Sequence, residues 1–347
     1  MSLRLGVDAG NFARDNRGMG RIAASVVAAA IADPEFEVAL LVDRRRDEAT
    51  IRERAGFAEA TIHSAARARR RGAYDVVWFP WNGVRYDVAA PLLLTLNDVF
   101  AFTEPHPQRV ARTREQAPIR RGVRRADRIV TISNWSKAEI VRVLEVDPAR
   151  INVVHPVPDA YFTPGDDLFM GAWRYVLMVG TREARKNAGV VFEACAQALR
   201  GPRDLLVIAG TTAPGDAATL ERLGVRHSFV PEPSDERLRA LYRNARAVAV
   251  PSTAEGFGLV AVEAMACGAP VLAASAAALP EATGAAATLL DPFDVAAWRD
   301  AIAAVFADDG LVRLLRERGI ARFAHASRER LVRAYLELFR RLAADQR

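Results

Sequence analysis

Residues 247–263 read AVAVPSTAEGFGLVAVE, and this stretch decides the fold of the second half of the chain. It begins with the apolar run Ala247–Pro251, passes through the loop Gly256–Gly258 and continues into Leu259–Cys267, which has helical composition. An apolar run without polar alternation is typical of a strand buried on both faces of a parallel sheet. The stretch therefore predicts a strand, a glycine loop and a helix, the unit from which doubly wound α/β domains are built.

Two glycines and two glutamates give this stretch its chemistry. Gly256 and Gly258 allow backbone N–H groups to approach an anion closely, and the helix that begins near Leu259 adds the positive end of its dipole. A carboxylate would repel phosphate, so Glu255 and Glu263 are expected to accept hydrogen bonds from hydroxyl groups instead. Hydroxyls on both sides of a diphosphate predict a sugar at one end of the ligand and a ribose at the other.

A second stretch, upstream, supplies matching cations. The apolar strand Tyr175–Gly180 is followed by Arg182, Arg185 and Lys186, directly before a predicted helix. Cations on a turn at the carboxyl end of a strand, beside a helix N-terminus, form a phosphate site. The alternative is a solvated loop with three incidental cations.

Strands and helices alternate on either side of these stretches. In the second half we predict strands at Tyr175–Gly180, Leu205–Gly210, His227–Val230, Ala247–Pro251 and Val271–Ala274, and helices at Asn187–Leu199, Ser234–Asn244 and Leu259–Cys267. In the first half we predict strands at Leu3–Asp8, Glu37–Asp43, Val76–Pro80, Leu92–Leu96, Arg128–Ser133 and Ile151–Pro156, and a helix at Met19–Ala32.

This alternation predicts an α/β protein with two doubly wound, Rossmann-like domains. Residues 159–172 have no sustained period and predict a linker, and Ser327–Leu342 predicts a long amphipathic helix. The predicted domains are therefore 1–165 and 166–326, with a terminal helix in 327–347 that packs back on the first domain. Open α/β sheets bind ligands at the carboxyl ends of their strands, which predicts a site in the cleft between the domains.

Composition excludes several classes of protein. The chain has 347 residues, enough for two domains, and its 51% hydrophobic and 26% charged residues exclude a disordered chain. We find no apolar window of the roughly 18 residues needed to cross a bilayer and no secretory signal. Cys195 and Cys267 lie in alanine-rich helical stretches, so we expect neither disulfides nor a metal site. These features predict a cytoplasmic protein.

The net charge of +6 comes mostly from arginine, which clusters at Arg67–Arg71 and Arg109–Arg128. These clusters are either solvated helix faces or, alternatively, a surface for peripheral contact with an anionic membrane at its inner face. Nucleic acid is the third alternative, but neither zinc spacing nor interleaved aromatic and basic residues support it. We therefore expect no nucleic-acid partner.

Taken together, the motifs resemble family 4 of the retaining glycosyltransferases, which have the GT-B fold of two Rossmann-like domains facing across a cleft. The resemblance rests on YVLMVGTREARKN, LVIAG, LRALYRNARAVAVPSTAEGFGLVAVEAMACGAPVLAAS and LPEATGAAATLLDPFD, in this order, over most of residues 175–294. It implies a metal-independent enzyme without a cofactor, which takes a nucleotide diphosphate sugar as its donor substrate.

The resemblance also implies roles for individual residues. Lys186, assisted by Arg185 or Arg182, would contact the donor pyrophosphate; Glu255 would bind sugar hydroxyls and Glu263 ribose hydroxyls. Main-chain groups near Phe229–Pro231 would recognise the base. The full donor-binding set implied is Gly18, Gly20, Thr181, Arg182, Arg185, Lys186, Gly210, Val230, Glu255, Gly256, Phe257, Gly258, Leu259, Val260 and Glu263. One departure is Gly180-Thr181, where many members have Gly-Arg, so that phosphate binding falls to Arg182 or Arg185.

In the first half, Asn16–Arg21 resembles the glycine-rich loop that brings acceptor-domain amides to the donor. Gly18–Ala23 also fits the dinucleotide-binding pattern G-x-G-x-x-A, with Asp43 at the end of the next strand as a ribose-binding acid. These glycines come some ten residues after the strand Leu3–Asp8 ends, too late for the tight turn of a dinucleotide site. The resemblance to the family's loop is therefore the interpretation we favour.

Leu94–Phe100 resembles the family's strand that ends in His-Asp, with Asn97 in place of the histidine. Asparagine can bond to a sugar hydroxyl but cannot carry a proton, which puts a general base at this position in doubt. Asp98 is a candidate for orienting the acceptor, and a simple turn-forming Asn-Asp pair is the alternative. With Glu255, Lys186 and Arg185, these two residues complete the implied catalytic set.

The sequence thus predicts transfer of a hexose to a glycan or lipid-linked acceptor, with retention of the anomeric configuration. The Gly-Thr…Arg-Lys-Asn variant resembles mannosyltransferases of polysaccharide assembly, which favours a GDP-mannose-type donor by analogy. The alternative is a GT-B protein that binds nucleotide sugars without transferring them, which Asn97 favours. Thermal shifts with nucleotide sugars would identify the donor.

Overall fold

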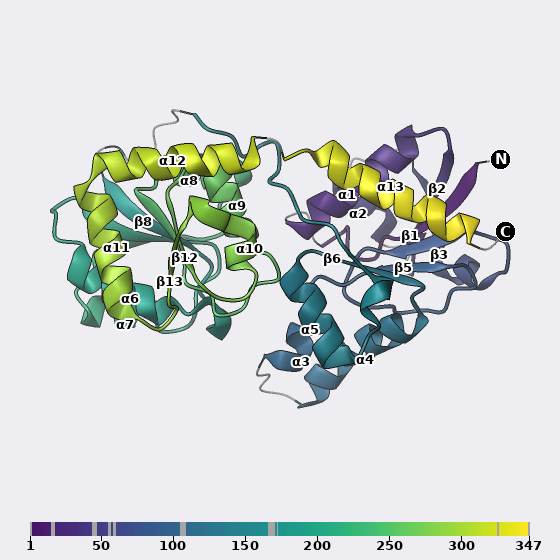
Figure 1. Ribbon diagram of the computed structural model, residues 1–347. Coiled ribbons are helices and arrows are strands. Elements are labelled where there is room, and N and C mark those ends of the chain that lie inside the picture. Colours follow the sequence, from purple (N-terminus) through teal and green to yellow (C-terminus); the bar gives the residue numbers. More distant parts are fainter. Residues whose placement is uncertain are drawn as a thin grey trace. The chain divides into compact units, whose positions relative to one another are not determined.

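The computed structural model describes residues 2–14, 18–43, 47–54, 57, 60–104, 109–165, 171, 173–324 and 326–345. The chain forms two compact units, one made of Met1–Pro156 with Ser327–Arg347 and the other of Val157–Ala326. We call them the N-unit and the C-unit. Each is an α/β unit built around one parallel sheet, as predicted (Figure 1).

The N-unit has a seven-stranded parallel sheet in the order β3-β2-β1-β4-β5-β6-β7. Its strands are β1 (Leu3–Asp8), β2 (Phe36–Val42), β3 (Thr61–Ser64), β4 (Val76–Phe79), β5 (Leu92–Thr95), β6 (Arg128–Thr131) and β7 (Ile151–Val153). Its helices are α1 (Met19–Ala32), α2 (Glu48–Arg54), α3 (Phe100–Thr103), α4 (Arg109–Arg125), α5 (Asn134–Leu144) and α13 (Arg328–Ala344), with 3-10 turns at Ala65–Arg69 and Pro148–Arg150.

The terminal helix α13 is an integral part of the N-unit. It packs against α1, β1 and β4, and the rings of Tyr335 and Phe339 lie 5.2 and 5.5 Å from that of Trp78 on β4. Ser327 caps the helix by accepting a hydrogen bond from the Arg330 amide over 3.2 Å. The apolar stripe of α13 is therefore part of the core of the N-unit.

The C-unit has a six-stranded parallel sheet in the order β10-β9-β8-β11-β12-β13. Its strands are β8 (Arg174–Val179), β9 (Asp204–Ala209), β10 (His227–Val230), β11 (Ala247–Val250), β12 (Val271–Ala274) and β13 (Thr288–Leu290). Its helices are α6 (Ala188–Ala198), α7 (Asp216–Arg222), α8 (Asp235–Asn244), α9 (Leu259–Ala266), α10 (Leu279–Thr283), α11 (Val295–Ala307) and α12 (Asp309–Phe323), with 3-10 turns at Ala184–Lys186 and Gly284–Ala286.

The strand order of the C-unit fixes where a ligand should bind. Numbered from β8, it is 3-2-1-4-5-6, the order of the Rossmann fold. The chain leaves the sheet in opposite directions on either side of the pair β8–β11, so a crevice opens at the carboxyl ends of these two strands. The loops that follow them are residues 180–187 and 251–258, which contain the two predicted motifs.

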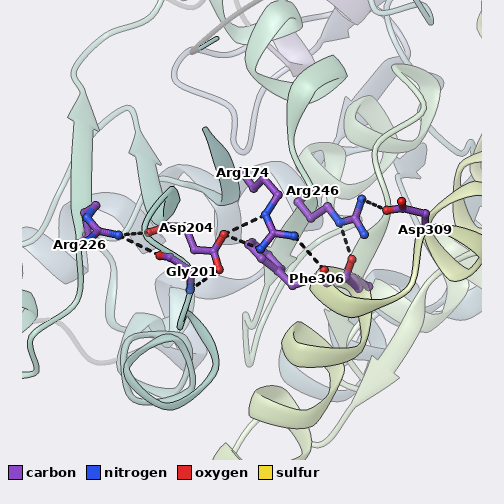
Figure 2. Close-up of polar contacts among 8 residues, drawn as sticks. Arg174, Gly201, Asp204, Arg226, Arg246, Phe306 and Asp309 are labelled. Carbon is purple, nitrogen blue, oxygen red and sulfur yellow. Dashed lines mark hydrogen bonds and ion pairs between the residues drawn. The ribbon is translucent and has the colours of Figure 1, made fainter. Parts of the chain in front are cut away.

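At the opposite edge of the same sheet, the amino edge, arginines bond to main-chain carbonyls (Figure 2). The Arg174 guanidinium donates to Asp204 and to the carbonyl of Phe306, and Asp204 is only 4% exposed. Arg226 donates to the carbonyls of Gly201 and Asp204. Arg246 donates to the Val305 carbonyl and pairs with Asp309. The last carbonyl groups of α11 thus accept hydrogen bonds from these cations instead of being left unsatisfied.

The residues predicted as a linker belong partly to the C-unit, whose boundary lies at Pro156/Val157 and not at 165/166. Phe162 is 3% exposed and packs edge-on against Tyr242 at 5.8 Å. Arg243 donates to the Thr163 and Pro164 carbonyls. Sequence periodicity cannot detect such an anchor, because a single buried ring in an irregular segment has no period.

The predicted strands and helices agree with the structure within two or three residues at each end. The prediction missed β3 and β13, both short edge strands. It also gave no bounds for the helices α2, α3, α4, α5, α7, α10, α11 and α12. Ser133 and Ser234 cap α5 and α8, and Cys195 and Cys267 are buried and unbridged. Within the described residues, none of the helices is both long enough and apolar enough to cross a membrane.

Candidate functional site

The two predicted motifs meet at the carboxyl edge of the C-unit. Lys186 Nζ donates to Glu255 Oε1 over 2.7 Å, and Arg185 lies 3.2 Å from Glu255 Oε2. Ser252 Oγ donates to the same Oε1 over 2.8 Å. Arg185 also donates to the Ala254 carbonyl and pairs with Glu183. Residues 69 positions apart in the chain therefore form one cluster of two cations around one carboxylate.

This cluster keeps Glu255 ionised. Burial by itself would raise the pKa of Glu255, but the charges of Lys186 and Arg185, with the hydrogen bonds from Lys186 and Ser252, hold this pKa below its ordinary value. The cations and the carboxylate are all less than one fifth exposed. A ligand that brings its own negative charge would thus meet two cations that share the Glu255 carboxylate as a partner.

The glycine loop places the start of α9 next to this cluster. Gly258 has φ +97°, and a Cβ there would lie 2.6 Å from Leu279 Cδ2, so both the backbone and the neighbouring side chain require glycine. Gly258 is the N-cap of α9 and has no side chain with which to accept the first N–H groups of the helix. Phe257 is buried. The first turn of α9, which includes Leu259 and Val260, therefore presents amides and the positive end of a dipole.

Glu263, on the second turn of α9, has a buried partner. Tyr242 on α8 donates from its hydroxyl to Glu263 Oε2 over 3.3 Å. Its ring is fully buried. The two predicted glutamates thus differ in their partners, since Glu255 lies among cations and Glu263 accepts from a neutral phenol.

Thr181 lies in the same edge, but its hydroxyl has a partner in the C-unit. It donates to Asp216 Oδ2 over 2.6 Å, and the Ala213 amide donates to the same oxygen. Gly180 and Gly210, with φ +71° and +85°, end the adjacent strands β8 and β9, and the Gly210 amide donates to the Val230 carbonyl.

Of the two arginines that the sequence left as alternatives, only Arg185 is placed in the cluster. Arg182 is exposed, whereas Arg185 contacts Glu255. A small pocket adjoins this cluster; it is lined by Met178, Val179, Gly180, Lys186, Ala249, Val250, Pro251, Ser252 and Val260.

The predicted residues of the N-unit lie at the carboxyl edge of its own sheet. Gly18, with φ +49°, is the N-cap of α1, and Gly20 is buried in its first turn; Asn16 and Arg17 lie outside the described residues. Asp98 Oδ1 accepts from the Phe100 amide, the turn-forming contact that we kept as an alternative. The Asn97 amide donates to Asn82 Oδ1 over 2.8 Å.

Asp8 at the end of β1 was not among the predicted site residues. It is 8% exposed and accepts from the Tyr86 hydroxyl over 3.0 Å. Burial raises the pKa of Asp8 to about 6, although Tyr86 and the charge of Arg85 act in the opposite direction. A buried carboxyl at a strand end was visible in the sequence only as the polar last residue of an apolar strand.

Sequence analysis also missed Ser252, Tyr242, Asp216 and Asn187. Asn187 Nδ2 donates to the Pro251 and Pro292 carbonyls and so joins the loops that follow β8, β11 and β13. In the sequence, Tyr242 follows Leu238 and Leu241 at helical spacing and so fits the apolar side of α8. The only sequence signal for its role is that a buried tyrosine needs a partner for its hydroxyl.

Two family models match the chain in succession. Residues 20–160 match the model described as Glycosyltransferase Family 4, and residues 171–322 match Glycosyl transferases group 1. The two matches follow one another along the chain. The first falls in the N-unit apart from its last few residues, and the second contains both motifs of the site.

Among curated proteins, the chain is similar to the D-inositol 3-phosphate glycosyltransferases of Mycolicibacterium vanbaalenii and Mycobacterium bovis. The identities are 39% over 209 residues and 38% over 207 residues. These matches cover 53% and 54% of the chain and 46% and 42% of the relatives, so the matched part spans about half the length of either relative or less.

Solved structures are similar over nearly the whole chain. Sucrose-phosphate synthase from Thermosynechococcus elongatus gives a TM-score of 0.74 at 19% identity and covers 99% of this chain and 100% of the other. The HepE protein of Anabaena, in complex with UDP and glucose, gives 0.72 at 16% identity, with 97% and 99% covered. These likenesses show the GT-B type of fold, two Rossmann-like units in one chain.

Proposed function

We propose that the protein is a retaining glycosyltransferase that moves a hexose from a nucleotide diphosphate sugar to an acceptor hydroxyl in glycan, polysaccharide or glycolipid synthesis. The observation that carries the proposal is the cluster of Lys186, Arg185 and Glu255 at the β8–β11 crevice, next to the start of α9. Cations and helix amides fit a diphosphate, and carboxylates fit the hydroxyls on either side of it.

In this proposal the residues act on the charge that develops as the sugar leaves. Lys186 and Arg185 turn from Glu255 to the diphosphate and stabilise its growing negative charge, with the first turn of α9. Glu255, released from the cations, accepts from sugar hydroxyls, and Glu263 accepts from the ribose. The cations and the helix dipole take the part that a metal plays elsewhere, so the reaction is metal-independent. The departing phosphate accepts the proton of the acceptor hydroxyl, since Asn97 cannot.

The donor is tested by thermal unfolding with GDP-mannose, UDP-glucose, UDP-galactose and ADP-glucose. The sequence resemblance favours a GDP-mannose-type donor, and HepE was solved with UDP-glucose. A ligand at about 100 times its Kd stabilises the folded state by roughly 2.7 kcal/mol, which is several degrees. We expect GDP-mannose to give the largest shift. A larger shift with a UDP sugar would reassign the donor, and no shift with any sugar nucleotide would contradict the donor site.

A protein that binds nucleotide sugars without transfer is the second candidate, favoured by Asn97 in place of histidine. Release of free nucleotide from the bound donor, measured with and without candidate acceptors, separates the two. Acceptor-dependent release supports transfer, and binding without release supports the alternative.

We further propose that α4 contacts an anionic membrane surface near a lipid-linked acceptor. Arg114, Arg120 and Arg124 are exposed on α4, and Val110 is 67% exposed. Arg121 and Arg125 instead bind the Arg85 and Val88 carbonyls and hold α4 to its unit. Binding to anionic liposomes at low salt that is lost at high salt supports this contact, and no binding at low salt rules it out.

A further inference from the structure

Tyr242 is a buried side chain whose hydroxyl reaches the donor site. It lies on α8 in the core of the C-unit, and its ring packs on Phe162 and is fully buried. Its hydroxyl donates to Glu263 Oε2 across the space between α8 and α9. Phenylalanine would fill the same space without needing a hydrogen-bond partner. The hydroxyl therefore has no packing function, and its partner is the carboxylate assigned to ribose.

We propose that Tyr242 is a positioning residue, which holds Glu263 in the conformation that binds the two ribose hydroxyls of the donor. This inference rests on the proposed function, in which Glu263 binds ribose. A glutamate side chain has three rotatable bonds, and the conformational entropy that it loses when a ligand fixes them opposes binding. A hydrogen bond to one carboxylate oxygen fixes these bonds before the ligand arrives.

The chemistry of the pair suits this role. Burial, and then the negative charge of Glu263, raise the pKa of Tyr242 well above its ordinary value, so the phenol remains protonated. A protonated phenol donates to a carboxylate and favours its ionised form, which is the form that accepts from two hydroxyls. The expected consequence is selectivity for ribose over 2′-deoxyribose, because an oriented carboxylate discriminates against a ligand that lacks a donor.

Tyr175 provides a matched control for Tyr242. It is equally buried in the same core, and its hydroxyl donates to the Leu241 carbonyl over 2.8 Å. Tyr175→Phe and Tyr242→Phe thus each remove one buried hydroxyl and keep the ring. Only the second hydroxyl contacts Glu263. The difference between the variants isolates the effect on the donor site from a general loss of stability.

The experiment measures the Kd of UDP, GDP and ADP for the full chain by calorimetry, and then the Kd of the 2′-deoxy form of the tightest binder. A charge-assisted hydrogen bond predicts a preference for ribose of roughly tenfold or more in the parent protein. We expect Tyr242→Phe to lower this ratio at least about threefold and Tyr175→Phe to leave it unchanged. Glu263→Gln should lower it as well, and adding Tyr242→Phe to Glu263→Gln should have little further effect.

The outcomes separate this inference from the proposed function. If Tyr242→Phe keeps the ribose preference of the parent protein and Glu263→Gln lowers it, the positioning role alone is overturned. A parental ratio in Glu263→Gln overturns the ribose assignment and the inference with it. An equal fall in Tyr175→Phe and Tyr242→Phe also overturns the inference, because the effect would then come from the core in general. Midpoints of thermal unfolding, expected to fall by similar amounts in both tyrosine variants, show that each variant is folded.

Discussion

At the amino edge of the C-unit sheet, arginines bind main-chain carbonyls and the carboxylates of Asp204 and Asp309 (Figure 2). At the carboxyl edge, Lys186 and Arg185 bind the side chain of Glu255. Burial alone does not separate Arg246 from Arg185, whose side chains are 16% and 17% exposed, although Arg174 at the amino edge is 46% exposed. The difference lies in the partners. A carbonyl at the end of a helix is held by the backbone, whereas rotation of the Glu255 side chain would free Lys186 and one contact of Arg185 for a ligand; Arg185 also bonds the Ala254 carbonyl and Glu183.

The two carboxyl edges of the molecule differ as well. Glu255 in the C-unit has a lowered pKa because two cations surround it, and Asp8 in the N-unit has a raised pKa because it is buried, although the hydrogen bond from Tyr86 opposes this shift. Cations thus gather at one switch point, between β8 and β11, and a buried carboxyl lies at the other, between β1 and β4. The comparison indicates that a fold repeated within one chain supports different chemistry at corresponding places.

The largest effect is expected when the ion pair of Lys186 and Glu255 is removed. Lys186→Ala and Glu255→Ala should each lower the rate of sugar transfer roughly 100- to 1000-fold, because they remove stabilisation of the departing diphosphate or of the sugar. Initial rates with the donor from the thermal-shift panel measure this effect. Arg174→Ala, at the amino edge, is the control and should retain kcat/KM. Full activity in both site variants would contradict the assignment.

A second prediction concerns the buried acid of the N-unit. The pKa of Asp8 is raised from 3.8 to about 6 in the folded state, so the folded protein binds this proton more tightly than the unfolded chain does. The stability that Asp8 contributes is therefore complete below about pH 4 and is lost as the pH rises through 6. Relative to Asp8→Asn, the parent should lose up to about 3 kcal/mol over this range.

Urea unfolding of both proteins at pH 4.5 and pH 7.5 measures the effect of Asp8. The free energy of unfolding of Asp8→Asn, relative to that of the parent, should increase between these two pH values and stay constant above about pH 7. An advantage that shrinks as the pH rises would mean that the pKa of Asp8 is lowered and not raised.

The smallest effect is expected at the amino edge. Asp204→Ala removes the acceptor of Arg174 and of the Gly201 amide, and leaves these donors without that partner. We expect the free energy of unfolding to fall by about 1–3 kcal/mol, with kcat/KM unchanged. The urea midpoint and the rate together test this. A lower kcat/KM at undiminished stability would show that the two edges do not divide their roles as we infer.

The sequence predicted the parts of the fold that have a strong local signal. Ala247–Val250 and Leu259–Ala266 were placed within a residue because an apolar strand, glycines and a helix follow one another. The edge strands β3 and β13 were missed, since their exposed or half-buried residues lack a continuous apolar run. The linker boundary was wrong because Phe162 is buried by a contact with α8 that no local pattern encodes.

The candidate site was predictable to a similar extent. Lys186, Glu255 and Gly258 could be named because cations, carboxylates and a glycine loop occur together at strand ends beside predicted helix starts, which is the combination that fits a diphosphate and the hydroxyls beside it. The partners of these residues could not be named. Ser252 and Tyr242 act through single hydroxyls, and their contacts depend on how separate elements pack. Asn97 and Asp98 remain predictions as acceptor-binding residues.

The anchored segment before β8 has a consequence for work with fragments of the protein. A recombinant C-unit that begins at residue 166 would lose Phe162 and the Thr163 and Pro164 carbonyls that Arg243 binds, and would expose the ring of Tyr242 to water. A fragment that begins at Val157 keeps Phe162, Thr163 and Pro164 in place. The same few residues therefore decide whether the C-unit keeps an intact core when it is produced by itself.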